Sequence, residues 1–253
     1  MSRLANLRIW VQLLVTIGIA LALVWTGAIV WQDRVNRDLM IEQAGDFSLS
    51  MHDATMAGLT GMMVTGTISQ RAVFLDQVRQ LNNIRDLRVV RADAVTKMFG
   101  KGIAGDIADP DPLEKQVLAS GQAVVRIESD ASGEVLRAVR PTLASKAYLG
   151  KDCTICHQAA EGAVLGVVSM KLSLDAANAA LARQRLSSIL VAIFTGIPVL
   201  LVIHPFIRKV VTRPLEQGVE IARSIAHGDL SREIGVASTN EIGQLQQLSL
   251  IHI

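Results

Sequence analysis

The sequence has 253 residues, half of which are hydrophobic, and its formal net charge is only +2. Nucleic-acid-binding domains usually carry a strong basic excess, so this composition does not indicate one. The hydrophobic residues are concentrated in two long runs, and a single soluble core therefore does not describe the chain. The pattern indicates two membrane-spanning segments on either side of a domain.

The first apolar run covers residues 9–31 and contains no charged side chain. A helix needs about 20 apolar residues to cross the hydrocarbon core of a bilayer, and this run is long enough. A cleaved signal peptide is the alternative, but its apolar core is usually about 7–15 residues and ends at a small-residue cleavage site. The segment Trp31-Gln32-Asp33-Arg34 is a poor cleavage site, which favours an uncleaved anchor.

The second apolar run covers residues 186–207 and includes Pro198 and Pro205. Membrane helices tolerate proline better than soluble helices do. A buried core helix is the alternative, but a run of this length without Asp, Glu, Lys or Arg favours a second membrane span.

Basic residues flank the outer ends of both runs. Residues 1–8 carry Arg3 and Arg8 without an acid, and the second run is followed by Arg208, Lys209 and Arg213. Cytoplasmic flanks are enriched in Lys and Arg, so we expect both termini in the cytoplasm and two passes through the inner membrane of a bacterium. Residues 33–185 would then form one periplasmic domain of ordinary size.

The chain has only two cysteines, Cys153 and Cys156, and His157 follows directly. Cys-x-x-Cys-His is the attachment pattern of c-type haem. Two thiols at this spacing can add to the two vinyl groups of a haem, and the adjacent imidazole can then bind the iron. We therefore expect one covalent haem c, with His157 as an axial ligand.

Three alternatives compete with the haem interpretation. A thioredoxin-type redox pair would open a helix in a βαβ unit and would not need His157. A structural zinc site would need two more ligands, and the sequence offers no second Cys or His pair. A disulfide between cysteines this close would be strained and is rare.

The segment between the two apolar runs is predicted to be an α+β domain. Residues 33–66 are expected to be helical and to continue the first apolar run. Residues 67–70, Thr-Ile-Ser-Gln, fit a capping box that would open a second helix. The apolar face of this second helix would comprise Phe74, Leu75, Val78 and Leu81. A third helix is predicted from the capping sequence Asp111-Pro112-Leu113-Glu114, and Gly121 would end it.

Strands are predicted where apolar residues alternate or form short runs. The four predicted strands cover residues 84–91, 123–128, 134–139 and 162–174. Ser132-Gly133 would form the turn between the second and third of them. Residues 175–184 would then lead as a helix into the second apolar run.

Several segments of this domain resemble the haem c PAS-like periplasmic sensor domains of bacterial methyl-accepting chemotaxis proteins. The matching segments are residues 56–63, 87–91, 99–100, 117–121, 149–157 and 162–170. The resemblance implies an antiparallel sheet flanked by long helices. It also implies a parallel homodimer, in which we expect residues 33–66 to lie at the interface.

The same resemblance bears on the second axial ligand of the iron. In that family a methionine on the long first helix can bind the iron in one redox state, and residues 51–63 are rich in candidates. Met62 and Met63 rank first, Met56 next, and His52 is the alternative. On a helix these side chains lie on or beside one face. The competing interpretation is that the methionines fill gaps in a helical interface.

Residues 208–247 resemble a HAMP module, a parallel four-helix bundle of two chains that relays the motion of membrane helices. Leu215, Gly218, Ala222 and Ile225 have the spacing of a coiled-coil seam. Gly228-Asp229-Leu230 would break this helix, and Asn240-Glu241-Ile242-Gly243 would open a second helix that contains Leu245.

The second HAMP helix is too short to be complete. Residues 248–253 depart from the heptad pattern and resemble the translated end of a transposon used in sequencing libraries. We therefore expect these six residues to be a non-native tail and the native match to stop near Gln247.

Together these features predict a haem-based chemoreceptor or sensor kinase that responds to redox state or a small gas. The favoured missing output is a methyl-accepting domain that would engage a chemotaxis adaptor and kinase. No catalytic constellation is visible, so we expect no enzyme activity in these residues. A membrane-anchored monohaem electron carrier is the alternative, although a carrier needs no HAMP module. A haem that only braces a small-molecule receptor is the third possibility.

Overall fold

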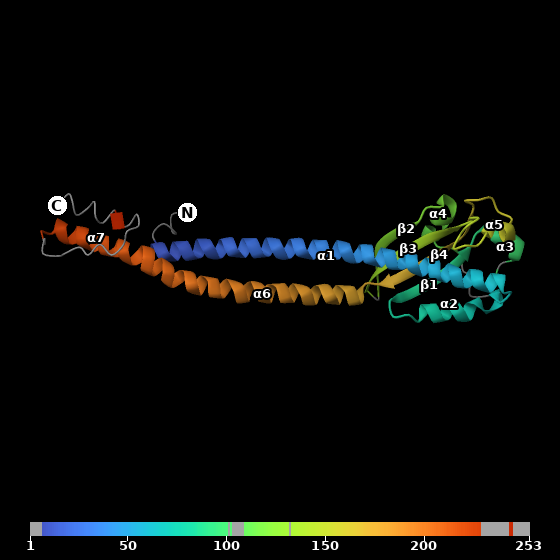
Figure 1. Cartoon of the computed structure of the whole chain (residues 1–253), viewed down its shortest axis with the longest axis horizontal. Helices are drawn as coiled ribbons and strands as arrows, with labels where there is room; N and C mark the ends of the chain where they lie inside the picture. The colour runs from blue at the N-terminus through green and yellow to red at the C-terminus, as the bar shows by residue number, and fades with distance from the viewer. Residues whose placement is uncertain (1–6, 101, 103–108, 132, 229–242, 245–253) are drawn as a thin grey trace. The chain divides into compact units, whose positions relative to one another are not determined.

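The computed structural model describes residues 7–100, 102, 109–131, 133–228 and 243–244 (Figure 1). The chain divides into two compact units. One comprises Met1–Gln32 with Gln184–Ile253, and the other comprises Asp33–Arg183. Each unit is described by itself below, although helices α1 and α6 contribute residues to both.

The first unit contains the two predicted membrane segments. Helix α1 covers Ile9–Val64 and begins with the first apolar run, and α6 covers Asp175–Ile207 and includes the second. Both helices are long and apolar enough to cross a membrane, and their most apolar stretches are not buried within the chain. The prediction that residues 33–66 continue the first run as a helix is confirmed, with α1 ending at Val64.

Helix α6 contains Pro198 and Pro205, and a π-helical turn, η3, follows at Arg208–Thr212. The Arg213 N–H donates to the Arg208 carbonyl, five residues earlier, which is the hydrogen bond of a π-helix. Helix α7 then runs from Arg213 to Ala226, and Gly228 has a positive φ of 83° that ends it. The expected break at Gly228 is confirmed.

The rest of the predicted HAMP helix break, Asp229 and Leu230, lies outside the described residues. So do Asn240-Glu241-Ile242, Leu245, Gln247 and the tail 248–253. Gly243 and Gln244 are described, and both are helical.

The second unit is built on one antiparallel sheet with strand order β1-β4-β3-β2. The strands are β1 Ile84–Arg91, β2 Val124–Asp130, β3 Gly133–Leu143 and β4 Val164–Ser173. Strands β2 and β3 form the predicted hairpin, paired from Val124 opposite Val139 to Asp130 opposite Gly133. Ser132, the other predicted turn residue, lies outside the described residues. The sheet and the helices around it confirm the α+β fold class.

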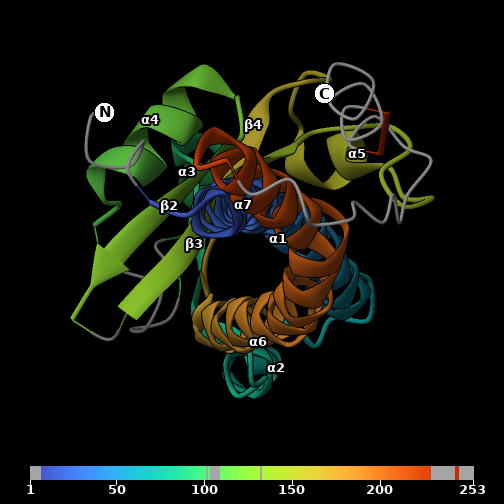
Figure 2. The ribbon, with the colours of Figure 1, turned by 90° about the vertical axis from the view of Figure 1, so that its left-hand side faces the viewer.

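Both faces of the sheet are covered, as Figure 2 shows for α2 and α4, which lie on opposite sides. On one face, Leu87 packs in a core cluster with Met56 and Leu59 of α1 and Leu75 of α2. On the other face, the smaller cluster comprises Val90, Leu113, Val117, Val139 and Val167. Alternate residues of a strand point to opposite faces, which explains how Leu87 and Val90 of one strand enter different clusters.

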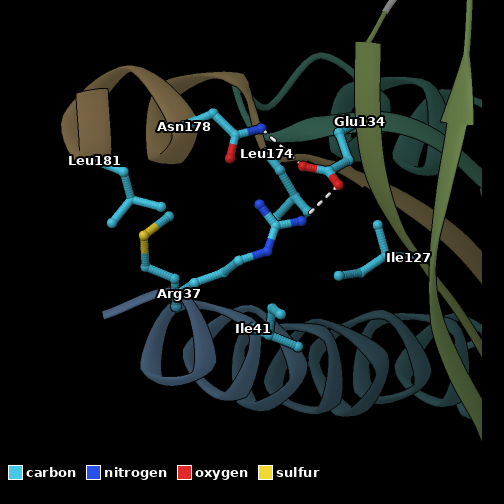
Figure 3. Close-up of a pocket in the computed structure, with 8 residues that line it drawn as sticks. Arg37, Ile41, Ile127, Glu134, Leu174, Asn178 and Leu181 are labelled. Carbon is cyan, nitrogen blue, oxygen red and sulfur yellow. Dashed lines mark hydrogen bonds and ion pairs between the residues drawn. The ribbon is translucent and has the colours of Figure 1, made fainter. Parts of the chain in front are cut away.

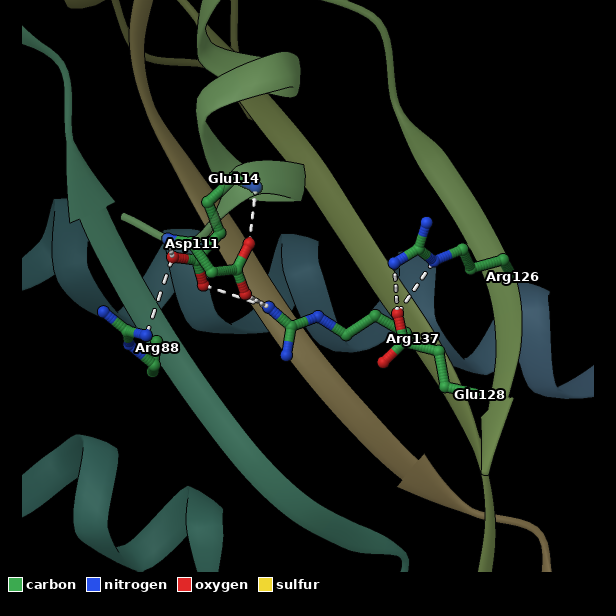
Figure 4. Close-up of polar contacts among 6 residues, drawn as sticks. All are labelled: Arg88, Asp111, Glu114, Arg126, Glu128 and Arg137. Atoms are coloured by element: carbon green, nitrogen blue, oxygen red, sulfur yellow. Dashed lines mark hydrogen bonds and ion pairs between the residues drawn. The ribbon is translucent and has the colours of Figure 1, made fainter. Parts of the chain in front are cut away.

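Helix α4, Pro112–Ser120, begins and ends as the sequence predicts. The Asp111 side chain accepts a hydrogen bond from the Glu114 backbone N–H, and the Glu114 carboxylate accepts one from the Asp111 N–H. At the other end, Gly121 adopts the left-handed conformation with φ 66°. An ion-pair network joins this helix to the sheet, because Arg137 of β3 pairs with both Asp111 and Glu114 (Figure 4).

The capping box predicted at residues 67–70 is wrong. Thr67 has φ −99° and ψ 15°, outside the extended region that an N-cap residue normally adopts, and it makes no capping hydrogen bond. Its hydroxyl lies 2.9 Å from the Thr65 hydroxyl instead. A 3-10 turn, η1 Ile68–Gln70, precedes helix α2, Arg71–Arg79. Leu81 therefore lies beyond the helix and is exposed, whereas the Leu75 side chain is buried as predicted.

Two features are absent from the predictions. Helix α3, Asp93–Phe99, has no side-chain cap at Ala92, so no capping signal marks its start. Strand β3 continues past Val139 through Pro141 to Leu143. Proline lacks the N–H that a central strand needs and is therefore usually confined to edge strands. The pairing of β3 with β2 extends only as far as Val139, so β3 is an edge strand beyond that point and Pro141 pairs with β4 alone.

Candidate functional site

The Cys-x-x-Cys-His sequence lies in a connection between β3 and β4, residues 144–163, which we call the CxxCH loop. Its ends are fastened to each other by two backbone hydrogen bonds. The Ala144 N–H donates to the Ala163 carbonyl at 2.8 Å, and the Gly162 N–H donates to the Ala144 carbonyl at 2.7 Å. The loop is therefore closed at its base, as compact surface loops commonly are.

A tight turn directs the first half of the CxxCH loop. Leu149 and Gly150 both have positive φ, 46° and 76°, and the Lys151 N–H donates to the Tyr148 carbonyl at 2.9 Å. Positive φ at both central residues is characteristic of a type I′ turn, which reverses the chain tightly. The turn brings Asp152 to the start of the motif helix.

The motif itself forms helix α5, Cys153–His157. The Asp152 carboxylate accepts hydrogen bonds from the backbone N–H and the hydroxyl of Thr154, at 2.8 and 2.6 Å. These bonds lower the pKa of Asp152, because they stabilise its ionised form. The Cys153 N–H donates to the Ser145 carbonyl at 2.9 Å, so helix α5 is tied to the base of its own loop.

The three motif side chains differ in their surroundings. Cys153 is half-buried and packs against a small cluster that includes Val95 and Leu165, whereas Cys156 is exposed. His157 lies edge-on to the Phe99 ring of α3, with 5.4 Å between the ring centroids. Burial, with a smaller contribution from the Arg91 charge, lowers the pKa of His157 and favours the neutral imidazole. Neutral imidazole is the form that binds metal ions.

The structure bears on each alternative to a haem. Both cysteines are free thiols. The sheet is antiparallel throughout, so the motif does not open the helix of a βαβ unit. Over the described residues, no group of three or more His, Cys, Asp and Glu side chains is arranged to hold a metal ion.

The residues present fit a covalently held haem. Two free thiols three residues apart and a neutral imidazole are the donor set that attachment requires. The Nδ1 atom of His157 is buried without a hydrogen-bond partner among the described residues. Exposed apolar side chains, Phe99 and Ile155, lie on α3 and on α5 itself.

The candidates for the second axial ligand all lie on α1 but differ in burial. Met56 belongs to the main core cluster, and His52 is buried with its Nδ1 atom unpartnered among the described residues. Burial lowers the pKa of His52. Met62 is half-buried and Met63 is exposed. Among the described residues, no hydrogen bond or ring contact joins any of these side chains to His157, so the distal ligand stays a prediction.

Tyr148, Asp53 and Phe99 contact the CxxCH loop or belong to it, and the sequence patterns assigned none of them a role. Tyr148 is the only tyrosine of the chain. Its hydroxyl donates to the Asp53 carboxylate of α1 at 2.9 Å. The sequence shows a single tyrosine directly before Leu-Gly, which could have drawn attention to Tyr148. Its hydrogen bond to Asp53, 95 positions away, cannot be inferred from the sequence.

Comparison with known protein families matches residues 206–247 to the HAMP domain. The chain is thus a membrane-anchored signalling protein. The HAMP match begins at the end of α6 and includes all of α7, where the sequence predicts the first helix of such a module. Comparison with curated proteins found no match.

A HAMP domain indicates signal transduction across a membrane. Two long apolar helices with a sheet domain between them in sequence, followed by HAMP, fit a membrane-anchored signalling protein. The predicted seam residues of α7, Leu215 and Ile225 among them, are not buried within the single chain. An apolar seam that one chain covers only in part suits a module that pairs with a second copy.

Proposed function

We propose that this protein is a haem c sensor in which the CxxCH loop carries the cofactor and HAMP relays its state across the membrane. The observation that carries the proposal is the placement of Cys153, Cys156 and His157 on one short helix. That helix belongs to the unit Asp33–Arg183, which the two apolar helical segments bracket in sequence.

Each residue of the motif has a distinct role in this proposal. The Cys153 and Cys156 thiols would form the two thioethers, and the His157 imidazole would bind the iron as the proximal ligand. When bound, the haem supplies a redox-active iron that can also take up a small diatomic ligand. The Asp152 cap and the Ser145 carbonyl hold α5 in place, and Phe99 packs against the imidazole.

The sensor unit is proposed to lie in the periplasm of a bacterium, with HAMP in the cytoplasm. The basic flanks at the outer ends of the two apolar runs support this orientation. Haem c is attached outside the cytoplasmic membrane of bacteria, which agrees with the same placement. The signal would be redox state or a small gas, and a methyl-accepting chemotaxis domain is the favoured output.

The decisive test is covalent haem. The 253-residue chain would be expressed with a haem c maturation system, and haem would be followed on denaturing gels. We expect haem to stay with the polypeptide, and Cys153→Ala or Cys156→Ala to abolish normal attachment. Ile155→Ala is the matched control, because Ile155 is exposed on the same helix but contributes no thiol. Unaltered attachment in both cysteine variants would refute the assignment.

A second measurement separates a sensor from an electron carrier or a bracing haem. Hydrogen–deuterium exchange of α1 and α6 would be compared between oxidised, reduced and carbon monoxide-treated protein. A sensor requires that the state of the haem alters at least one of these helices, because ligands act by shifting conformational populations. Identical hydrogen–deuterium exchange of α1 and α6 in all three states would contradict a sensor and would favour an electron-transfer or bracing role for the haem.

A further inference from the structure

We infer that the hydrogen bond between Tyr148 and Asp53 is the connection through which the CxxCH loop positions helix α1. This inference rests on the proposed function, since it gives the haem-carrying loop a route to a helix that continues into the first apolar segment. It makes Tyr148 and Asp53 positioning residues, distinct from Cys153, Cys156 and His157, which would hold the haem in the proposed site.

The CxxCH loop is largely self-contained, which limits the routes by which it can act on the rest of the protein. Its base is closed by the bonds between Ala144, Gly162 and Ala163, and the Asp152 carboxylate bonds within the loop. Within the part of the chain that the structure describes, the bond from Tyr148 is the hydrogen bond that leaves residues 145–162 for another element.

Other interactions of the loop lead to α3, β4 and β1, where the Arg91 charge acts on His157. His157 meets Phe99 of α3, and Cys153 packs against the cluster that contains Val95 of α3 and Leu165 of β4. A change at α5 can therefore reach α3 and β4 by packing. It can reach α1 through Tyr148, four residues before Asp152.

Tyr148 is well placed to transmit a displacement. Its ring is partly buried and packs against the main core cluster, where Met51 and Met56 of α1 also lie. The type I′ turn at Leu149-Gly150 connects it to Asp152 and α5 through a short, hydrogen-bonded segment. The backbone of Tyr148 is thus connected to α5, and its hydroxyl is hydrogen-bonded to Asp53. A displacement of α5 would therefore also displace the Asp53 side chain.

The receiving residue lies on a continuous helix. Asp53 belongs to α1, which runs unbroken from Ile9 to Val64. Burial of the phenol and its bond to the Asp53 carboxylate raise the pKa of Tyr148. The phenol therefore stays protonated near neutral pH and remains a hydrogen-bond donor.

The first part of the test needs no haem. Tyr148 is the only tyrosine of the 253 residues, so the absorbance of phenolate in this chain reports this residue alone. At about pH 11 an ordinary tyrosine is mostly ionised, whereas wild-type Tyr148 should remain mostly protonated. Asp53→Asn should increase the phenolate fraction at this pH. Asp46→Asn, an exposed carboxylate on the same helix, should not. A wild-type phenol that ionises like a free tyrosine would overturn the contact.

The second part uses the haem-loaded chain of 253 residues. Tyr148→Phe removes the hydroxyl but keeps the ring, so covalent haem and its redox spectrum should be unchanged. We expect the redox-dependent difference in amide exchange around Asp53 to disappear in Tyr148→Phe and in Asp53→Asn. Asp46→Asn should keep it. If Tyr148→Phe retains the difference, the inference is wrong. Absence of covalent haem from the wild type would instead overturn the proposed function, and the inference with it.

Discussion

Arg37 of α1 donates a hydrogen bond from Nη2 to Oε1 of Glu134, the second residue of β3, at 2.7 Å. The other oxygen of the same carboxylate accepts a hydrogen bond from Asn178 of α6 at 3.0 Å (Figure 3). Glu134 thus joins the sheet to both of the long helices. The backbone takes part as well, because the Leu174 N–H donates to the Glu134 carbonyl.

This bridge predicts a specific loss of stability in acid. The hydrogen bonds from Asn178 and Arg37 lower the pKa of Glu134 below its ordinary value of 4.5. A depressed pKa stabilises the fold above the unfolded-state value, and this contribution is lost as the pH falls through the folded-state value. Glu134→Gln should therefore lower the thermal midpoint at pH 7 but have little effect near pH 3.

The effect at pH 7 should be modest, up to about 1 kcal/mol, because Arg37 is half exposed and the pair is screened by solvent. Circular dichroism of the 253-residue chain in detergent would measure this loss of stability. Glu128→Gln is the control, since Glu128 pairs with Arg126 on its own strand and joins no helix to the sheet. An equal loss at both pH values for Glu134→Gln would contradict the explanation.

The buried ion pairs under α4 should be more sensitive to substitution than the surface pairs. The Glu114 side chain is fully buried, and Arg137, which donates to it at 3.2 Å, is 6% exposed. Arg137→Met would leave the buried Glu114 carboxylate with the Asp111 N–H at 3.0 Å and, among the described residues, one nearby cation, Arg88 at 3.6 Å. Removal of one partner of a buried pair typically costs about 3–5 kcal/mol. Urea unfolding should show a loss of this size.

The exposed pair of Arg126 and Glu128 provides the comparison (Figure 4). Arg126→Met should cost no more than about 1 kcal/mol. The double variant Arg137→Met/Glu114→Gln should be less destabilised than the sum of the two single variants, because it removes both charges of one coupled pair. Additive losses would show that the pair is not coupled.

The distal ligand can be tested without disturbing the core. Met→Leu removes the thioether sulfur and nearly preserves volume, so we expect small stability losses at Met56, Met62 and Met63. If one of these binds iron, its leucine variant should change the spin state in the reduced or the oxidised spectrum. Met62 and Met63 are the candidates for which we most expect this change. If these variants and His52→Ala all retain wild-type spectra in both redox states, the methionines serve in packing.

The proposed homodimer predicts which apolar surface is covered by a second chain. Val35, Leu39 and Leu49 of α1 are exposed, and their spacing places them on one helical face. Leu39→Glu should weaken association of the detergent-solubilised chain by about tenfold or more, measured by light scattering over a concentration series. Val73→Glu is the control, because Val73 is an exposed apolar residue on α2. A wild-type chain that stays monomeric at all concentrations would contradict the proposal.

The sequence alone determined the features that depend on neighbouring residues. The apolar runs in α1 and α6, the capping box of Asp111 with Glu114, and the helix end at Gly121 follow from short-range rules. The placement of the two thiols and the imidazole within α5 likewise follows from their spacing in the sequence. The failed capping box at Thr67 marks the limit of such rules, because its backbone conformation departs from the one that capping requires.

Only the tertiary structure decided which distant residues meet. Helix α3 has no capping signal, and its Phe99 reaches His157 only after α3 and the CxxCH loop are placed by β1 and β4. The Tyr148–Asp53 contact joins residues 95 positions apart, and the Arg37–Glu134 contact joins residues 97 positions apart. Such contacts depend on strand order and on which helix covers which sheet face. These arrangements result from the burial of apolar surface over the whole domain, which no local pattern encodes.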